Sequence, residues 1–213
     1  EAGLRDVVGL LLHAALDDLK KEFNVRAIIG FSGGSDTYDT KSQRAVVDTI
    51  KLLAPYNIAV LCGGTSGGVP GYAAAAAHSN KLPLIGVVPQ RAKDKCMDGL
   101  DKILIVPPHV GTSEWGDESE VFVKLCDGIE MVTGGLGTAL EFYHAMKMNS
   151  GRISKGHTPI YVVPYASGVG FSAAVNPSSL PGNVYSSLPP APIKTPAAAA
   201  RFLIDKLALW RTS

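Results

Sequence analysis

The stretch that decides the fold runs from Ile129 to Thr138 and reads IEMVTGGLGT. Its first four residues form a short run with strand propensity, and the six that follow contain three glycines. A helix-compatible segment, Ala139–Met148, comes directly after them. A strand, a glycine-rich turn and a helix in this order form one unit of an α/β fold, in which ligands bind at such turns.

The same alternation recurs along the rest of the chain. The strands that we expect share short, continuous apolar or β-branched runs; they are Arg26–Phe31, Ile58–Cys62, Leu84–Val88, Ile103–Val106, Ile129–Val132 and Ile160–Val163. The expected helices between them are Lys41–Leu53, Gly71–His78, Glu118–Cys126 and Ala139–Met148. Continuous rather than alternating apolar runs indicate strands that are buried on both faces. The pattern therefore predicts a doubly wound, mostly parallel Rossmann-like α/β sheet with flanking helices.

The two ends of the chain differ from this core. Apolar residues recur at helical spacing over residues 4–19, which predicts an amphipathic helix. Seven prolines fall in residues 164–196. This segment is too long for an ordinary connection, so it is either an extended arm over the surface or an oligomer contact. Residues 197–209 are expected to form a closing helix, with Thr195 as its N-cap and Pro196 at its first position.

Length and composition narrow the class of protein. A chain of 213 residues is long enough for one substantial core. We therefore expect one Rossmann-like domain over residues 1–213, with its core at about 24–164 and the arm and closing helix in 165–213. Hydrophobic residues make up 46% and charged residues 18%, which excludes a mainly disordered chain. The formal net charge is only +1, so binding to nucleic acid through a large basic surface is not expected.

Membrane insertion, secretion and metal binding are not expected either. No run approaches the roughly 18 consecutive apolar residues of a membrane-spanning helix, and the N-terminal stretch lacks the basic start and cleavage site of a signal peptide. Cys62, Cys96 and Cys126 have no metal-type spacing and are expected to be reduced, buried thiols. The histidines have no ligand spacing, so we predict no metal site. These features favour a cytoplasmic protein.

Three glycine clusters follow three of the expected strands, at residues 30–37, 63–71 and 133–138. In a doubly wound sheet these turns lie at the carboxyl edge, where ligands bind. Glycine lets the backbone approach an anion closely, and a helix N-terminus offers unpaired N–H groups. The alternative is that the glycines merely form tight turns, but three clusters at one edge favour a small phosphorylated ligand.

The candidate residues for binding phosphate come from these clusters and from one cation near the end of the third strand. They are Gly33, Gly34, Ser35, Gly64, Thr65, Ser66, Gly67, Gly134, Gly135, Gly137, Thr138 and Arg91. None of the clusters is a Walker A loop, because no Gly-Lys-Ser/Thr follows, and none is a complete dinucleotide-binding fingerprint.

Several motifs carry a family resemblance. Thr133–Glu141 (TGGLGTALE) resembles the PGGxGTxxE motif of the Lonely Guy family, whose members are often labelled lysine decarboxylases. Gly63–Gly71 (GGTSGGVPG) is similar to the GGGSxGLMG loop of that family, and Leu84–Pro89 (LIGVVP) is similar to its VIGVIP strand. Order and spacing agree from about residue 26 to residue 163. The resemblance implies the Rossmann-like fold of this superfamily.

The resemblance implies two kinds of function. One is a phosphoribohydrolase, which cleaves the N-glycosidic bond of a nucleoside 5′-monophosphate to give the free base and ribose 5-phosphate, with Glu141 as the catalytic glutamate. The other is a non-catalytic member that carries molybdenum cofactor or senses a nucleotide derived from ADP-ribose. Related proteins form dimers through helices that flank the motif, which implies a homodimer or a larger even oligomer. From the residues alone, Glu141 falls in the first turn of the expected helix, where the dipole favours an ionised carboxylate; a capping role is the alternative.

The chain departs from the family pattern at residues that matter for catalysis. Thr133 replaces the leading proline of the motif. Glu118 and Ser119 stand where active members of the family carry an Arg-Lys pair, and a glutamate there would repel a phosphate. Lys124 is one cation nearby, and Arg91 is another. The missing pair favours a carrier or sensor, with the phosphoribohydrolase as the alternative.

Four other side chains near the glycine clusters have two interpretations each. Asp36 and Asp39 follow the first cluster and could bind a ribose hydroxyl, although loop aspartates commonly cap a helix. Trp115 and Tyr143 could stack on a base, although packing in a core or an interface is the more common role.

Overall fold

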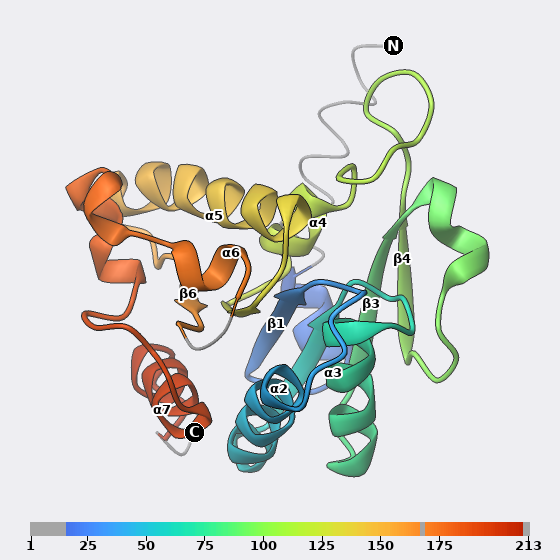
Figure 1. The fold of residues 1–213 in the computed structure, drawn as a ribbon, viewed down its shortest axis with the longest axis horizontal. Helices are drawn as coiled ribbons and strands as arrows, with labels where there is room; N and C mark the ends of the chain where they lie inside the picture. Colours follow the sequence, from blue (N-terminus) through green and yellow to red (C-terminus); the bar gives the residue numbers. More distant parts are fainter. Residues whose placement is uncertain (1–15, 167–168, 211–213) are drawn as a thin grey trace.

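The centre of the molecule is a six-stranded parallel sheet in the order β4-β3-β2-β1-β5-β6, shown in the computed structural model (Figure 1). The structure describes residues 16–166 and 169–210. The strands are β1 (Ala27–Gly33), β2 (Ile58–Cys62), β3 (Leu84–Pro89), β4 (Lys102–Val106), β5 (Gly128–Val132) and β6 (Tyr161–Pro164). Each of the six expected strands is present within two residues of its expected ends. The sheet confirms the predicted fold class.

The order of strands in the sheet reverses between β1 and β5. The chain passes from β1 through β2 and β3 to β4, and then returns to place β5 and β6 on the other side of β1. Gly30 of β1 pairs with Ile129 of β5 in parallel register. In sheets of this kind, ligands bind at the carboxyl ends of the strands where the order reverses. The first and third glycine clusters follow these two strands.

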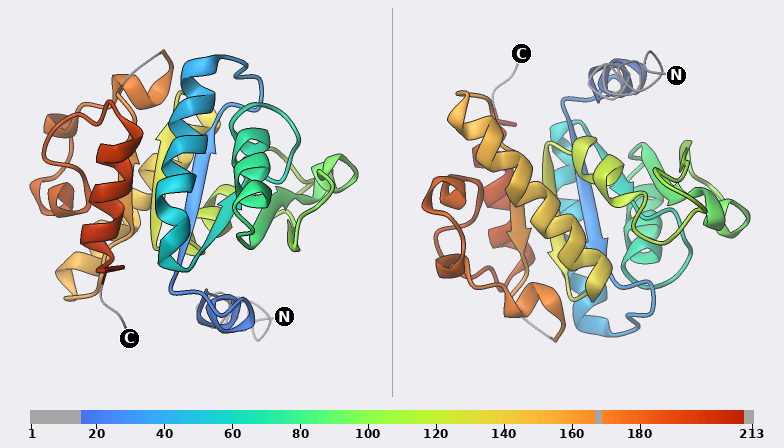
Figure 2. Two further views of the ribbon diagram at one scale, coloured as in Figure 1. Left: turned by 90° about the horizontal axis from the view of Figure 1, so that it is seen from below. Right: turned by 90° about the horizontal axis from the view of Figure 1, so that it is seen from above.

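Two layers of helices cover the sheet (Figure 2). One layer consists of α2 (Thr40–Leu53), α3 (Gly68–Ser79) and α7 (Pro196–Lys206), and the other contains α4 (Ser119–Lys124) and α5 (Leu136–Ser154). Each layer buries its own apolar cluster against one face of the strands. The strands are therefore apolar on both faces, as the continuous runs in the sequence predicted.

The predicted caps of two helices are present. Asp39 accepts a hydrogen bond from the amide of Ser42 and so caps α2. Thr195 accepts one from the amide of Ala198 and caps α7, with Pro196 at the first helical position. The amphipathic helix expected over residues 4–19 lies mostly outside the described residues; residues 16–22 are helical. None of the helices in residues 16–166 and 169–210 combines the length and apolar character that crossing a bilayer requires.

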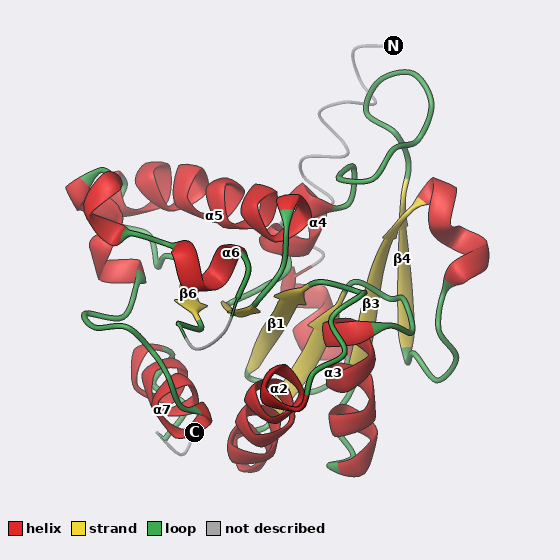
Figure 3. Cartoon of the chain, viewed as in Figure 1, coloured by secondary structure: helices red, strands yellow, loops and turns green. Residues whose placement is uncertain are grey.

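The proline-rich segment wraps the β6 edge of the sheet (Figure 3). It contains the short helices α6 (Phe171–Ala174), η3 (Pro177–Ser179) and η4 (Gly182–Ser187). Tyr165, just beyond β6, forms a parallel bridge with Ile193 at the far end of the segment. Val184 and Leu188 are buried against the α5 side of the sheet. Of the two alternatives left by the sequence, the structure shows an arm that packs over its own chain.

One strand residue has an ionisable side chain in the core. Glu130 of β5 is completely buried on the face covered by α2. Its Oε1 accepts a hydrogen bond from the Thr49 hydroxyl at 3.3 Å, whereas its Oε2 has no partner. Burial holds the pKa of the Glu130 carboxyl well above its usual range, so the group is held in its neutral form.

Candidate functional site

The three glycine clusters meet at the carboxyl edge of the sheet. The amide of Val69 donates to the carbonyl oxygen of Gly34 at 3.0 Å, which joins the first cluster to the second. A Cβ added at Gly67 would clash with the Ser35 carbonyl oxygen, so glycine permits this close approach. The hydroxyls of Thr37 and Thr133 lie 3.1 Å apart and join the first cluster to the third. The predicted convergence of the clusters is therefore present.

The N-terminus of α5 is the open part of this edge. The helix begins at Leu136, and its N-cap residue Gly135 supplies no side-chain hydrogen bond. Nothing lies within 4 Å of a Cβ built on Gly135 or Gly137. The first N–H groups of a helix have no partner within the helix, and the helix dipole is positive at this end. The start of α5 can therefore accept an anion such as phosphate.

The remaining glycine-cluster residues divide into exposed groups and packed groups. Ser35 and Ser66 present exposed hydroxyls. Thr138, in contrast, is 4% exposed and packs against Gly134, where an added Cβ would clash with its hydroxyl. Gly64 has a φ of +67° and accepts a hydrogen bond from the amide of Met97. Thr138 and Gly64 thus shape the loops, and the exposed serines are available to a ligand.

Glu141 lies behind the start of α5, but its charge state differs from the expectation. It is the sixth residue of the helix, beyond the first turn, so the dipole acts on it weakly. The Ser32 hydroxyl on β1 donates to its Oε2. Burial raises the pKa of the Glu141 carboxyl to about 7, and the charge of Glu118 adds to the rise, while the Ser32 hydrogen bond opposes it. Glu141 thus lies beyond the first turn in which the sequence placed it, and burial opposes the ionisation that the helix dipole would favour.

Glu118 is the N-cap residue of α4, and its charge acts on the Glu141 carboxyl. Its Oε2 accepts a hydrogen bond from the amide of Gly116 at 2.9 Å, and burial raises the pKa of the Glu118 carboxyl. Ser119 beside it is 1% exposed. Neither Glu118 nor Glu141 forms an ion pair with another described residue. The acidic pair therefore stands without the cations that the family pattern would place there.

The two candidate cations are engaged with other side chains. Arg91 lies on η2 (Gln90–Lys95), pairs with Glu114, and has its guanidinium 5.9 Å from the ring centroid of Trp115. Lys124 pairs with Glu120, one helical turn before it. A ligand phosphate would therefore compete with a carboxylate at either cation. Trp115 is 55% exposed and is held by Arg91 rather than packed in the core.

Two features of the site have no signal in the sequence. Thr133 has a φ of +56°, an unfavourable conformation for a β-branched residue. The segment around α6 also reaches the third cluster: the amide of Phe171 donates to the Gly134 carbonyl oxygen at 2.8 Å, and the amide of Ser172 donates to the Thr133 carbonyl oxygen at 3.0 Å. Contacts over this sequence distance have no local pattern by which they could be predicted.

Comparison with known proteins supports the resemblance to the Lonely Guy superfamily. A family model described as the SLOG cluster4 family matches residues 26–154, more than half of the chain. No curated protein matches the sequence. Among solved structures, the structural-genomics target TM1055 is 16% identical with a TM-score of 0.62, covering 84% of this chain and 97% of its own. The molybdenum cofactor carrier protein from Chlamydomonas reinhardtii is 22% identical with a TM-score of 0.55, covering 85% and 98%.

The same architecture occurs in a protein with a different ligand. DNA processing protein A from Helicobacter pylori, described as binding single-stranded DNA, is 14% identical with a TM-score of 0.55 and covers 87% of this chain and 83% of its own. At these levels of identity the structural matches show a shared fold only.

Proposed function

Because the chain belongs to the SLOG cluster4 family, within the Lonely Guy superfamily, we propose that it binds a small phosphorylated ligand at the glycine-rich edge and carries or senses it without turnover. The observation that supports this most directly is the uncapped N-terminus of α5, which faces open space at Gly135 and Gly137. It lies where the order of the sheet reverses, between β1 and β5. A phosphate placed there would be held by backbone N–H groups and would need no side-chain cation.

Molybdenum cofactor is the ligand that we propose first, with an ADP-ribose-type nucleotide as the other. The fold is shared with a molybdenum cofactor carrier protein over 85% of this chain. The site fits a phosphorylated cofactor at one end, because Gly135 and Gly137 leave room beside the start of α5. The exposed hydroxyls of Ser35 and Ser66 would complete the phosphate contacts. The cofactor is cargo in this proposal, so no chemical step is assigned to it.

Ligand binding is tested by comparing two glycines that both have open space around them. Gly135→Leu should weaken binding by about a hundredfold or more, because its side chain would fill the phosphate position and block the N–H groups. Gly182→Leu on η4, where an added Cβ also meets nothing, should leave binding unchanged. The measurements are mass spectrometry of ligands released from the purified protein and calorimetry with molybdopterin-type ligands and ADP-ribose. Equal affinity in the two variants would remove α5 from the binding site.

The alternative function is hydrolysis of a nucleoside 5′-monophosphate. The enclosed Glu141 carboxyl, hydrogen-bonded to Ser32, favours it, because such a group can stabilise developing positive charge or exchange a proton near neutral pH. The Glu118 charge opposes it, since a phosphate or a second carboxylate nearby would be repelled. We therefore expect little or no release of adenine from AMP.

A single substitution separates the carrier from the hydrolase. Glu118→Arg should raise any formation of ribose 5-phosphate from AMP by on the order of 10²-fold, because it replaces a repelling charge with a cation. Ser119 is left unchanged, since it is 1% exposed and a lysine there would be buried. Asp48→Arg, on the exposed surface of α2, is the control and should have no effect. Robust turnover by the unaltered protein, lost in Glu141→Ala, would contradict the carrier proposal.

Assembly into a homodimer is the third part of the proposal. Leu136, Leu140 and Tyr143 of α5 are 91%, 41% and 56% exposed, and their spacing puts them on one face of the helix. Such a contiguous apolar face is commonly covered by a partner. We expect a dimer by light scattering at micromolar concentration and a monomer for Leu140→Glu. A monomeric unaltered protein would exclude this arrangement.

A further inference from the structure

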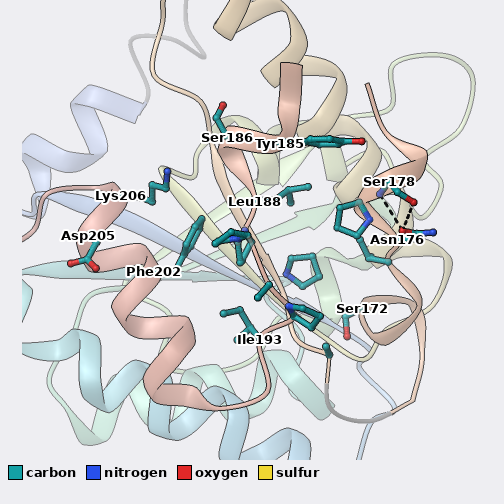
Figure 4. Close-up of a pocket in the computed structure, with 18 residues that line it drawn as sticks. Ser172, Asn176, Ser178, Tyr185, Ser186, Leu188, Ile193, Phe202, Asp205 and Lys206 are labelled. Atoms are coloured by element: carbon teal, nitrogen blue, oxygen red, sulfur yellow. Dashed lines mark hydrogen bonds between the residues drawn. The ribbon is translucent and has the colours of Figure 1, made fainter. Parts of the chain in front are cut away.

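A cavity of about 890 Å³ lies between the proline-rich arm and α7, beyond the β6 edge of the sheet (Figure 4). The arm contributes Pro189, Pro190 and Pro192, and α7 contributes Phe202 and Lys206. The volume is in the range of pockets for small molecules. None of the proposed phosphate-binding residues lines it, so it is separate from the glycine-rich edge.

The walls of this cavity are held in place by the backbone. The amide of Ala166 donates to the Ile193 carbonyl oxygen at 2.6 Å, and the Tyr165 hydroxyl donates to the Lys194 carbonyl oxygen at 2.9 Å. These bonds tie the end of the arm to the end of β6. Proline residues have a fixed φ, so the wall loses little conformational entropy when a ligand binds. The cavity is therefore preformed.

Most polar side chains that line the cavity are already bonded within the protein. Asn176 accepts hydrogen bonds from the amide and hydroxyl of Ser178. The hydroxyls of Ser172 and Tyr185 donate to backbone carbonyl oxygens. Asp205 lies 3.7 Å from Arg201 in an ion pair. These groups have little to offer a ligand, because using them would break an existing interaction.

Lys206 and Ser186 are the exceptions among the described lining residues. The Lys206 ammonium lies 5.8 Å from the ring centroids of Phe202 and Tyr161, and it has no carboxylate partner in residues 16–166 and 169–210. In Figure 4, Lys206 and Ser186 lie on one side of the view, whereas Asn176 and Ser178 lie on the other. Lys206 is therefore a cation of the lining with no carboxylate partner among the described residues, and the Ser186 hydroxyl lies on the same side of the view.

We propose that this cavity binds an apolar carboxylate, with its carboxylate at Lys206 and its hydrocarbon body against Phe202 and the prolines. An uncharged apolar molecule would use the apolar walls but would gain nothing from the Lys206 ammonium. A strongly polar ligand would gain nothing from the proline walls. A ligand with one carboxylate and an apolar chain matches both parts of the lining, because a charge-assisted hydrogen bond fixes one end and burial of apolar area holds the rest.

The test uses decanoate as the probe and decanol as its uncharged counterpart, both below the concentrations at which they aggregate. Calorimetry should show saturable binding of decanoate to the unaltered protein. Lys206→Met keeps most of the apolar stem and should weaken decanoate binding by about tenfold or more. Lys206→Arg keeps the charge and should stay within about threefold. Binding of decanol should be equal in the unaltered protein and in Lys206→Met.

Lys51→Met is the matched control. Lys51 lies on α2, is exposed, does not line the cavity and forms no ion pair within the described residues, so the substitution removes one positive charge without touching the cavity. It should leave decanoate binding unchanged. Lys206 is itself exposed, so its variants should fold. No binding of decanoate to the unaltered protein would overturn the proposal, and so would equal binding by Lys206→Met and the unaltered protein.

Discussion

Glu141→Gln is expected to raise the free energy of unfolding by about 3 kcal/mol at pH 8 and by only about 1 kcal/mol at pH 5. The reason is the rise in the pKa of Glu141 from 4.5 to about 7 on folding. Between pH 4.5 and pH 7, the Glu141 carboxyl keeps its proton in the native state, whereas it has released the proton in the unfolded chain. The free energy of unfolding is therefore highest below pH 4.5, falls as pH rises from 4.5 to about 7, and stays at the lower value above pH 7. Glutamine carries no charge and removes this loss.

The measurement is urea unfolding of both proteins at pH 5 and pH 8. Asp48→Asn is the control, because Asp48 is exposed and forms no ion pair within the described residues, and the substitution should change stability by less than about 0.5 kcal/mol at either pH. A gain for Glu141→Gln that is the same at both pH values would show that ionisation is not its cause. If ligand binding also weakens in Glu141→Gln, the destabilising carboxylate is retained for function.

Glu130→Met combined with Thr49→Val should stabilise the protein at neutral pH by about 1–3 kcal/mol. The two substitutions replace a buried carboxyl and its hydroxyl partner with apolar groups of similar size, and they remove the unpartnered Oε2. Because the pKa of Glu130 is held well above its usual range, the unaltered protein must lose stability as pH rises above about 4.5. The double variant should lack this slope.

Glu130→Gln provides the comparison for this second experiment. It removes the charge and so should also flatten the dependence on pH, but it leaves a buried polar group without full hydrogen bonding. Its gain in stability at neutral pH should therefore be smaller than that of the double variant. The stability of all three proteins is measured by thermal unfolding at several pH values between 5 and 8. A double variant that is less stable than the unaltered protein at every pH would mean that the Glu130 carboxyl has a stabilising role.

The strands were predictable because each is a short apolar run between turn residues. Six such runs were identified, and their burial on both faces follows from their continuous apolar character. The sequence predicts helix α5, but with its start at Ala139, whereas the helix begins three residues earlier at Leu136. This difference moves Glu141 out of the first turn and so weakens the effect of the helix dipole on its carboxyl. A motif gives the order of residues, but it does not give the depth of a carboxyl beneath the surface.

Two other parts of the molecule could not be predicted, for a common reason. The arm has no helical or strand periodicity, so its path over β6 and the cavity beneath it depend on contacts between residues far apart in sequence. Glu130 stands in a strand that was expected to be buried, but its lack of a second hydrogen-bond partner depends on which helix covers that face. Tertiary packing therefore determines both the path of the arm and the hydrogen bonding of Glu130.

The left-handed backbone at Thr133 limits which amino acids this position can hold. Proline fixes φ near −65°, whereas Thr133 has a φ of +56°. The proline at the start of the family motif therefore cannot be introduced here by one substitution alone, because the turn would have to rearrange and the contact with Thr37 would be lost. Asparagine and glycine tolerate this backbone better than threonine. The turn should consequently accept Thr133→Asn or Thr133→Gly but not Thr133→Pro.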